Sequence, residues 1–154
     1  MLVARPLSDT FSLPWSGDSA IDSSVDDFED KFRQCRETLN FSPLIKPGET
    51  PTMFVFKAIR GPEMEALRAT SKNGEFSPTE AILAFRMALV RVDNSEGFPK
   101  LAKVNNGELG LMVADSFMRF LDAQATEHWG NAFNGVASEL GTGVFLRSIA
   151  PSPK

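Results

Sequence analysis

The chain of 154 residues has a single cysteine, a single histidine and no tyrosine. One cysteine cannot form a disulfide framework, and one cysteine with one histidine cannot supply the four ligands of a structural zinc site. Long apolar runs are missing too: residues 81–90 form the longest, but Arg86 interrupts it and it falls short of the roughly 18 residues of a membrane span. These absences argue against a disulfide-stabilised module, a Cys/His zinc domain and a membrane-spanning helix.

Positive charge is also scarce, because 16 Lys and Arg stand against 20 Asp and Glu, which gives a net charge of −4. Nucleic acids and anionic membranes select clustered Lys and Arg, so we expect neither as the main partner. The negative excess lies wholly in residues 1–50, which hold nine acids and five bases, whereas residues 51–154 hold eleven of each. This imbalance favours a basic partner surface near the N-terminal third.

The first residues do not resemble an export signal, since Arg5 and Asp9 occur there and no apolar stretch of 7–15 residues follows. We therefore expect a cytoplasmic origin.

Residues 1–24 predict an extended N-terminal arm, because they are rich in Pro, Ser and Asp and show neither a helical nor a strand period. Large apolar side chains are nevertheless scattered through the segment, and they are costly to leave in water. The segment could be a strap folded over its own core, an arm that orders on a neighbouring subunit, or a disordered tail. The interface residues predicted from the second interpretation are Phe11, Leu13, Trp15 and Ile21.

Residues 25–150 predict a single mainly helical domain, with a tail at 151–154. The expected fold class is α+β, with four to five helices and a small β-hairpin element beside the arm. Its first helix should begin after a Ser24 cap and bury one apolar stripe, formed by Phe28, Phe32, Cys35 and Leu39. A strand at Met53–Ile59 should pair with Leu44 and Ile45 across a turn, and Pro62 should open the next helix.

The second half predicts three more elements. A central helix over residues 77–94 should start with a capping box of Ser77 and Glu80 and be apolar on most sides. A helix over residues 108–124 should follow. A last helix should start at a Thr126 cap and stop at Gly141, before a short strand at Val144–Arg147.

Catalytic chemistry is not indicated by any motif. His128 has no metal ligand or orienting acid four residues away on its helix, and Cys35 lies on an apolar stripe, as a packed small hydrophobe does. Arg86 and Arg91 could pair with Glu80 or Asp93. We therefore expect a protein that is not an enzyme, with no catalytic residue, metal or cofactor.

A family resemblance comes from the order of parts. The strand-then-helix segment Pro51–Arg68, the apolar helix and turn of residues 81–97 and the helical C-terminal half resemble small virion and tail assembly proteins of tailed bacteriophages. The resemblance implies a structural component of the virion, assembled in the host cytoplasm from copies of itself and other phage structural proteins. The alternatives are a tail assembly chaperone, or an acidic regulator that binds a host protein.

Overall fold

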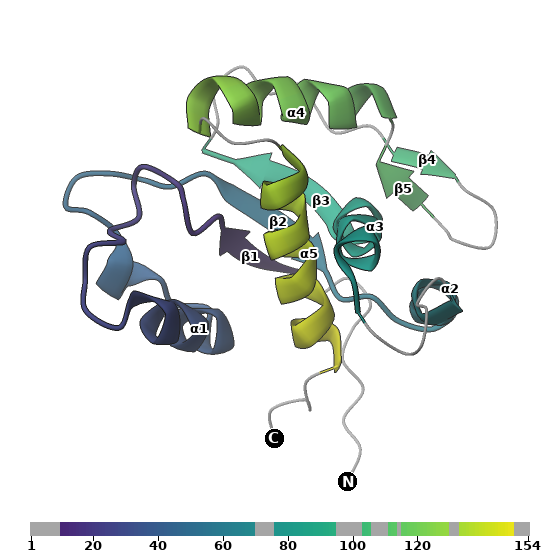
Figure 1. Ribbon diagram of the computed structural model, residues 1–154. Helices are drawn as coiled ribbons and strands as arrows, with labels where there is room; N and C mark the ends of the chain where they lie inside the picture. Colours follow the sequence, from purple (N-terminus) through teal and green to yellow (C-terminus); the bar gives the residue numbers. More distant parts are fainter. Residues whose placement is uncertain are drawn as a thin grey trace, which may run out of the picture.

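The computed structural model describes residues 10–69, 76–94, 103–105, 111–113, 115–129 and 133–149. Five α-helices, a three-stranded sheet and a two-stranded sheet confirm the α+β, mainly helical fold class (Figure 1). In chain order the elements are β1 (Thr10–Pro14), α1 (Phe28–Thr38), the 3-10 turn η1 (Ser42–Leu44), β2 (Met53–Lys57), α2 (Pro62–Ala69), α3 (Pro78–Ala88), β3 (Leu89–Asp93), β4 (Lys103–Asn105), β5 (Leu111–Val113), α4 (Asp115–Trp129) and α5 (Phe133–Ile149).

The larger sheet is antiparallel with strand order β1-β2-β3, so the predicted strand β2 occupies its centre. Phe54 and Phe56 of β2 are fully buried, and both rings make edge contacts with Phe85 of α3. The predicted hairpin partner of β2 is wrong: Leu44 belongs to η1, and Ile45 forms only an isolated bridge with Ile21. The true partners of β2 lie about 40 residues away on either side.

Helices α3 and α5 form the closest helix pair of the core. Gly141 lies inside α5, and a Cβ built on it would stand 1.7 Å from the carbonyl oxygen of Ala81 in α3. The predicted helix stop at Gly141 and the predicted strand at Val144–Arg147 are therefore wrong. This glycine permits close approach of two backbones, and α5 continues past it in front of the sheet (Figure 1).

The predicted capping box of α3 is confirmed, with Ser77 and Glu80 binding each other's backbone groups. The helix ends earlier than predicted, however, because the chain passes directly from Ala88 into β3 at Leu89. Val90 and Val92 are β-branched and suit a strand as well as a helix, and pairing with β2 decides between the two. The later boundaries also move: α4 begins at Asp115 after β5, and Thr126 lies inside α4 instead of capping α5.

The N-terminal segment from Thr10 onward is not an extended arm. β1 pairs with β2 from Thr10↔Lys57 to Pro14↔Met53, and the chain then crosses to Ile21, whose backbone bridges Ile45. We call residues 10–22 the strap. The first of the three interpretations, a strap folded over its own core, matches these residues within one chain; the domain boundary at residue 24 stays a prediction. Residues 1–9 lie outside the described part of the chain.

The four predicted interface residues lie in the strap and are buried against the rest of their own chain. Their exposed fractions are 2–8%, and all four belong to the main hydrophobic core. Within one chain these side chains are covered by its own core, and their assignment as residues of an interface stays a prediction. The residues are Phe11, Leu13, Trp15 and Ile21.

Candidate protein-contact site

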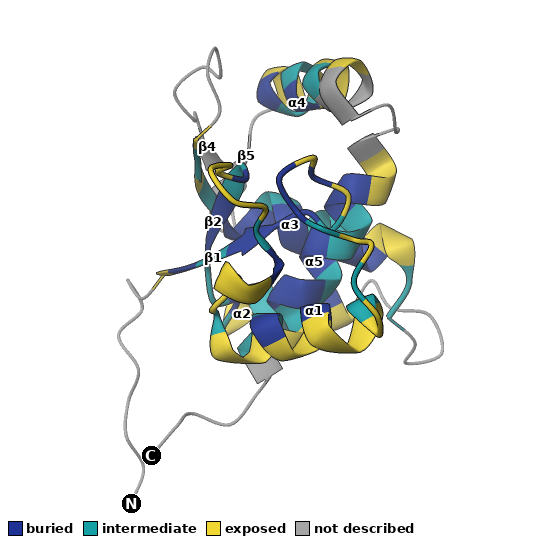
Figure 2. Ribbon diagram, turned by 90° about the vertical axis from the view of Figure 1, so that its left-hand side faces the viewer, coloured by how far each residue is buried: buried dark blue, intermediate teal, exposed yellow. Residues whose placement is uncertain are grey.

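Helix α1 lies largely exposed at the surface. It lies at the lower left of Figure 1, apart from the α3/α5 pair, and its outer face is exposed in Figure 2. Only Phe32 and Cys35 of its eleven residues are buried. Both belong to the predicted apolar stripe, whereas Phe28 and Leu39 are only partly buried. α1 is therefore held by a narrow seam and offers most of its circumference to a partner.

The beginning of α1 carries an acidic patch, which we define as Asp26, Asp27, Glu29 and Asp30, all exposed. Glu29 and Asp30 occupy the first helical turn, where negative charge is favoured by the helix dipole. Asp30 also pairs with Arg33 at 3.2 Å, but both side chains are more than half exposed, so this pair contributes little. The patch leaves a concentration of negative charge at the surface, as the N-terminal charge excess predicts.

The N-cap of α1 differs from the predicted one. Ser24 does not cap the helix; its backbone N–H and hydroxyl donate instead to the Asp22 carboxylate, which lowers the pKa of that group. Asp27 is the N-cap, with left-handed backbone angles of φ 56° and ψ 39°, and its side chain accepts no capping hydrogen bond. A capping residue normally has an extended backbone, so this helix begins without its usual cap.

Two hollows flank α1. One has a volume of about 440 Å³ and lies between α1 and η1, where Cys35, Lys31 and Leu44 line it. Burial raises the pKa of the Cys35 thiol, which agrees with its prediction as a packed small hydrophobe. The other has a volume of about 430 Å³, and its charged lining of Glu29, Asp30, Arg33, Arg36 and Glu139 joins α1 to α5.

The lining of the second hollow includes Ser16 and Glu139, and the two residues form a clasp. The Ser16 N–H donates to Glu139 Oε2 at 2.8 Å, and the Ser16 hydroxyl donates to Glu139 Oε1. Among the other lining residues, the Arg36 guanidinium lies 5.4 Å from the centroid of the Phe32 ring, within the range of a cation–π contact. Sequence reasoning missed this site, because the residues of the clasp are 123 positions apart.

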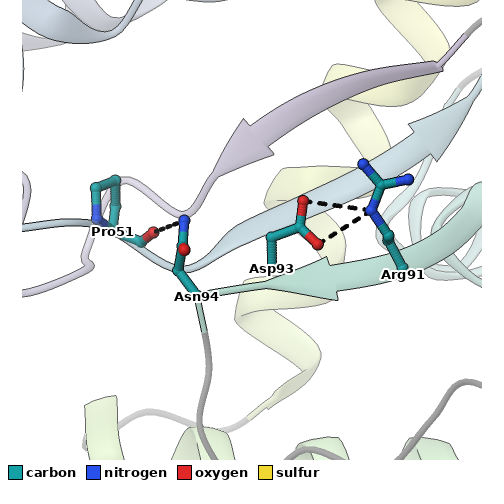
Figure 3. Close-up of polar contacts among 4 residues, drawn as sticks. All are labelled: Pro51, Arg91, Asp93 and Asn94. Atoms are coloured by element: carbon teal, nitrogen blue, oxygen red, sulfur yellow. Dashed lines mark hydrogen bonds and ion pairs between the residues drawn. The ribbon is translucent and has the colours of Figure 1, made fainter.

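A second clasp fixes the strap to the sheet through the buried Asp18. Its carboxylate accepts hydrogen bonds from the backbone N–H groups of Ala20 at 2.9 Å and Thr52 at 3.1 Å. Thr52 also donates its hydroxyl to the Asn94 carbonyl. The Asn94 side chain donates to the Pro51 carbonyl (Figure 3). The strap, the start of β2 and the end of β3 therefore share one polar junction.

The other candidate residues take structural positions. Arg91 pairs with Asp93 as predicted, on the same strand and at the surface (Figure 3). Arg86 pairs with Asp115 at the start of α4 instead of with Glu80. His128 lies on α4, but its side chain is outside the described part of the structure.

The described residues contain no group of three His, Cys, Asp or Glu side chains placed to hold a metal ion. Within the same residues, no helix has both the length and the apolar character needed to cross a membrane. The comparisons with known proteins found no matching family model, curated protein or solved structure.

Proposed function

We propose that this protein is a structural component of a tailed-bacteriophage virion, in the head, neck or tail, and that it acts by protein–protein contact. Its place in a phage particle is supported by a resemblance to small phage assembly proteins, which covers the strand-then-helix segment and the helical C-terminal half. The proposed setting is assembly in the host cytoplasm, with copies of itself and other phage structural proteins as partners, and without nucleic acid contact or catalysis.

The main support for a role in protein–protein contact is the acidic patch, which is exposed on a helix with only two buried side chains. Exposed surface charge steers partners of opposite charge and fixes the orientation in which they dock. A basic surface on a neighbouring particle protein is therefore the partner chemistry that the patch fits. The hollows beside α1 give such a partner concave surface into which side chains can insert.

Mass spectrometry of purified particles tests the proposal. A virion component should be present in them at a fixed stoichiometry, whereas a tail assembly chaperone should be present during assembly and absent from finished particles. Presence at fixed stoichiometry supports the proposal, and absence overturns the virion role in favour of the chaperone or the host-directed regulator.

A charge-reversal pair tests the patch itself. Asp26→Lys with Glu29→Lys should reduce incorporation into particles by at least about tenfold, because it replaces attraction by repulsion at the contact. The matched control is Glu49→Lys with Glu65→Lys, since both positions are exposed and the change in net charge is the same. Equal incorporation of the two double variants would show that the patch is not the contact.

A further inference from the structure

The strap is bound to the rest of the chain by a set of specific, non-covalent contacts. β1 pairs with β2 over five residues, Leu13 packs over Gly143, and the two clasps join Ser16 to Glu139 and Asp18 to Thr52. A Cβ on Gly143 would come within 3.0 Å of the Leu13 side chain, so the surface of α5 is shaped to receive the strap. Every one of these contacts could be made equally well with the same residues of a second copy of the chain.

We call the part of the chain from α1 onward the body. Residues 23–27 join the strap to the body, and we call them the hinge. It contains no helix or strand, and only Val25 is partly buried within it. Fully extended, five residues span up to about 17 Å. The hinge therefore lies at the surface, where a change of backbone direction disturbs little packing.

The hinge is strained when the strap is docked on its own chain. Asp27 ends it in the left-handed region, which Asp tolerates better than most residues but less well than glycine, and its side chain makes no capping hydrogen bond there. An extended hinge would return Asp27 to the backbone conformation of an ordinary N-cap, whose carboxylate can accept an N–H of the first helical turn. Opening the hinge thus relieves this strain. The strap keeps its contacts if it docks on a second copy of the chain, and it loses them otherwise.

We infer that the strap is exchanged between two copies of the chain, so that β1 of each copy pairs with β2 of the other. Exchange of an identical element requires no new surface, because the strap meets the same β2, Gly143 and Glu139 in the second copy. This inference rests on the proposed assembly role for its setting, and it names the partner as another copy of this chain.

A disulfide between chains tests the exchange. Thr10 and Lys57 lie directly opposite in the β1–β2 register, and such positions are close enough for a disulfide. Two chains are co-expressed with tags of different size, one with Thr10→Cys and the other with Lys57→Cys, both with Cys35→Ala. The exchanged pair should give a disulfide-linked heterodimer on a non-reducing gel, at least about tenfold above a control in which Glu49→Cys replaces Lys57→Cys.

A chain with both Thr10→Cys and Lys57→Cys shows whether the strand pairing has formed. If it closes internally at every protein concentration while the mixed pair gives no more heterodimer than the control, exchange is overturned. If the double variant forms neither product, native mass spectrometry of the unaltered chain decides: monomer alone overturns the inference, and a dimer that Asp27→Gly reduces supports it. Glycine removes the strain of the docked hinge, so Asp27→Gly should lower the exchanged fraction at least about fivefold.

The two proposals fail separately. Absence of the protein from purified particles would overturn the virion role without changing the yield of the heterodimer. An internally closed strap would overturn the exchange without changing the content of the particles.

Discussion

Replacing Gly141 by alanine tests the packing on which the core depends. The added Cβ would lie 1.7 Å from the carbonyl oxygen of Ala81 and 2.5 Å from its carbonyl carbon, whereas real contacts essentially never fall below 3.0 Å. The two helices must therefore separate by at least the missing 1.3 Å. The obstacle is backbone, so no side-chain rotation can relieve it.

The expected cost follows from the residues around the contact. Ala84 of α3 and Ala137 of α5 are fully buried, and separating the helices opens space beside them. Overpacking costs about 1–3 kcal/mol, and a backbone clash places this variant near about 3 kcal/mol. Alanine has a better helix propensity than glycine, which offsets about 1 kcal/mol of this cost. The net loss of unfolding free energy is therefore about 2 kcal/mol. For a chain of this size the Tm should fall by about 4–8 °C.

Gly135→Ala is the matched control, because Gly135 lies in the same helix with no atom within 4 Å of the added Cβ. It should raise the unfolding free energy by up to about 1 kcal/mol. Thermal unfolding followed by far-ultraviolet circular dichroism, with urea denaturation as a second measure, compares the two. A Gly141→Ala chain as stable as the Gly135→Ala chain would refute the close α3/α5 approach.

Three further predictions concern single side chains. Asp18→Ala should lower the unfolding free energy in urea by about 2–4 kcal/mol, because two backbone N–H groups lose their acceptor, and Asp18→Asn, which keeps one carbonyl oxygen, should lose about half of that. Burial raises the pKa of the Cys35 thiol above its ordinary 9.0, so the native chain at pH 8 should react with iodoacetamide at least about tenfold more slowly than the urea-unfolded chain. The unfolded thiol ionises first as the pH rises past 9, so stability should decline there; Cys35→Ala should remove that decline. Asp115→Asn breaks the ion pair with Arg86, but the Asp115 side chain is 74% exposed, so urea denaturation should show a loss below about 1 kcal/mol.

The elements that the sequence predicted well are those whose signals are local. The capping box of Ser77 and Glu80 requires residues three positions apart, and the start of α2 at Pro62 needs only one residue. β2 and the buried centre of α3 were also predicted, because alternation or apolar density over about ten residues is enough. Such patterns depend on neighbours in the chain and are visible in one sequence.

The elements that were mispredicted depend on distant partners. Gly141 has the same local appearance as a helix stop, and only the approach of Ala81 shows that it serves close packing. Residues 89–93 continue an apolar helix pattern, yet they pair with β2. The candidate site follows the same rule: the acidic patch is local and could be anticipated, whereas the clasp of Ser16 and Glu139 joins residues from opposite parts of the chain.

That clasp has a consequence for the order of events during synthesis. Glu139 is translated 123 residues after Ser16, which at about 5–20 residues per second is a delay of about 6–25 s. Throughout that interval the α5 surface that will cover the apolar side chains around Ser16 does not yet exist. A chain whose α5 has already folded can therefore present that surface to the waiting segment of another chain.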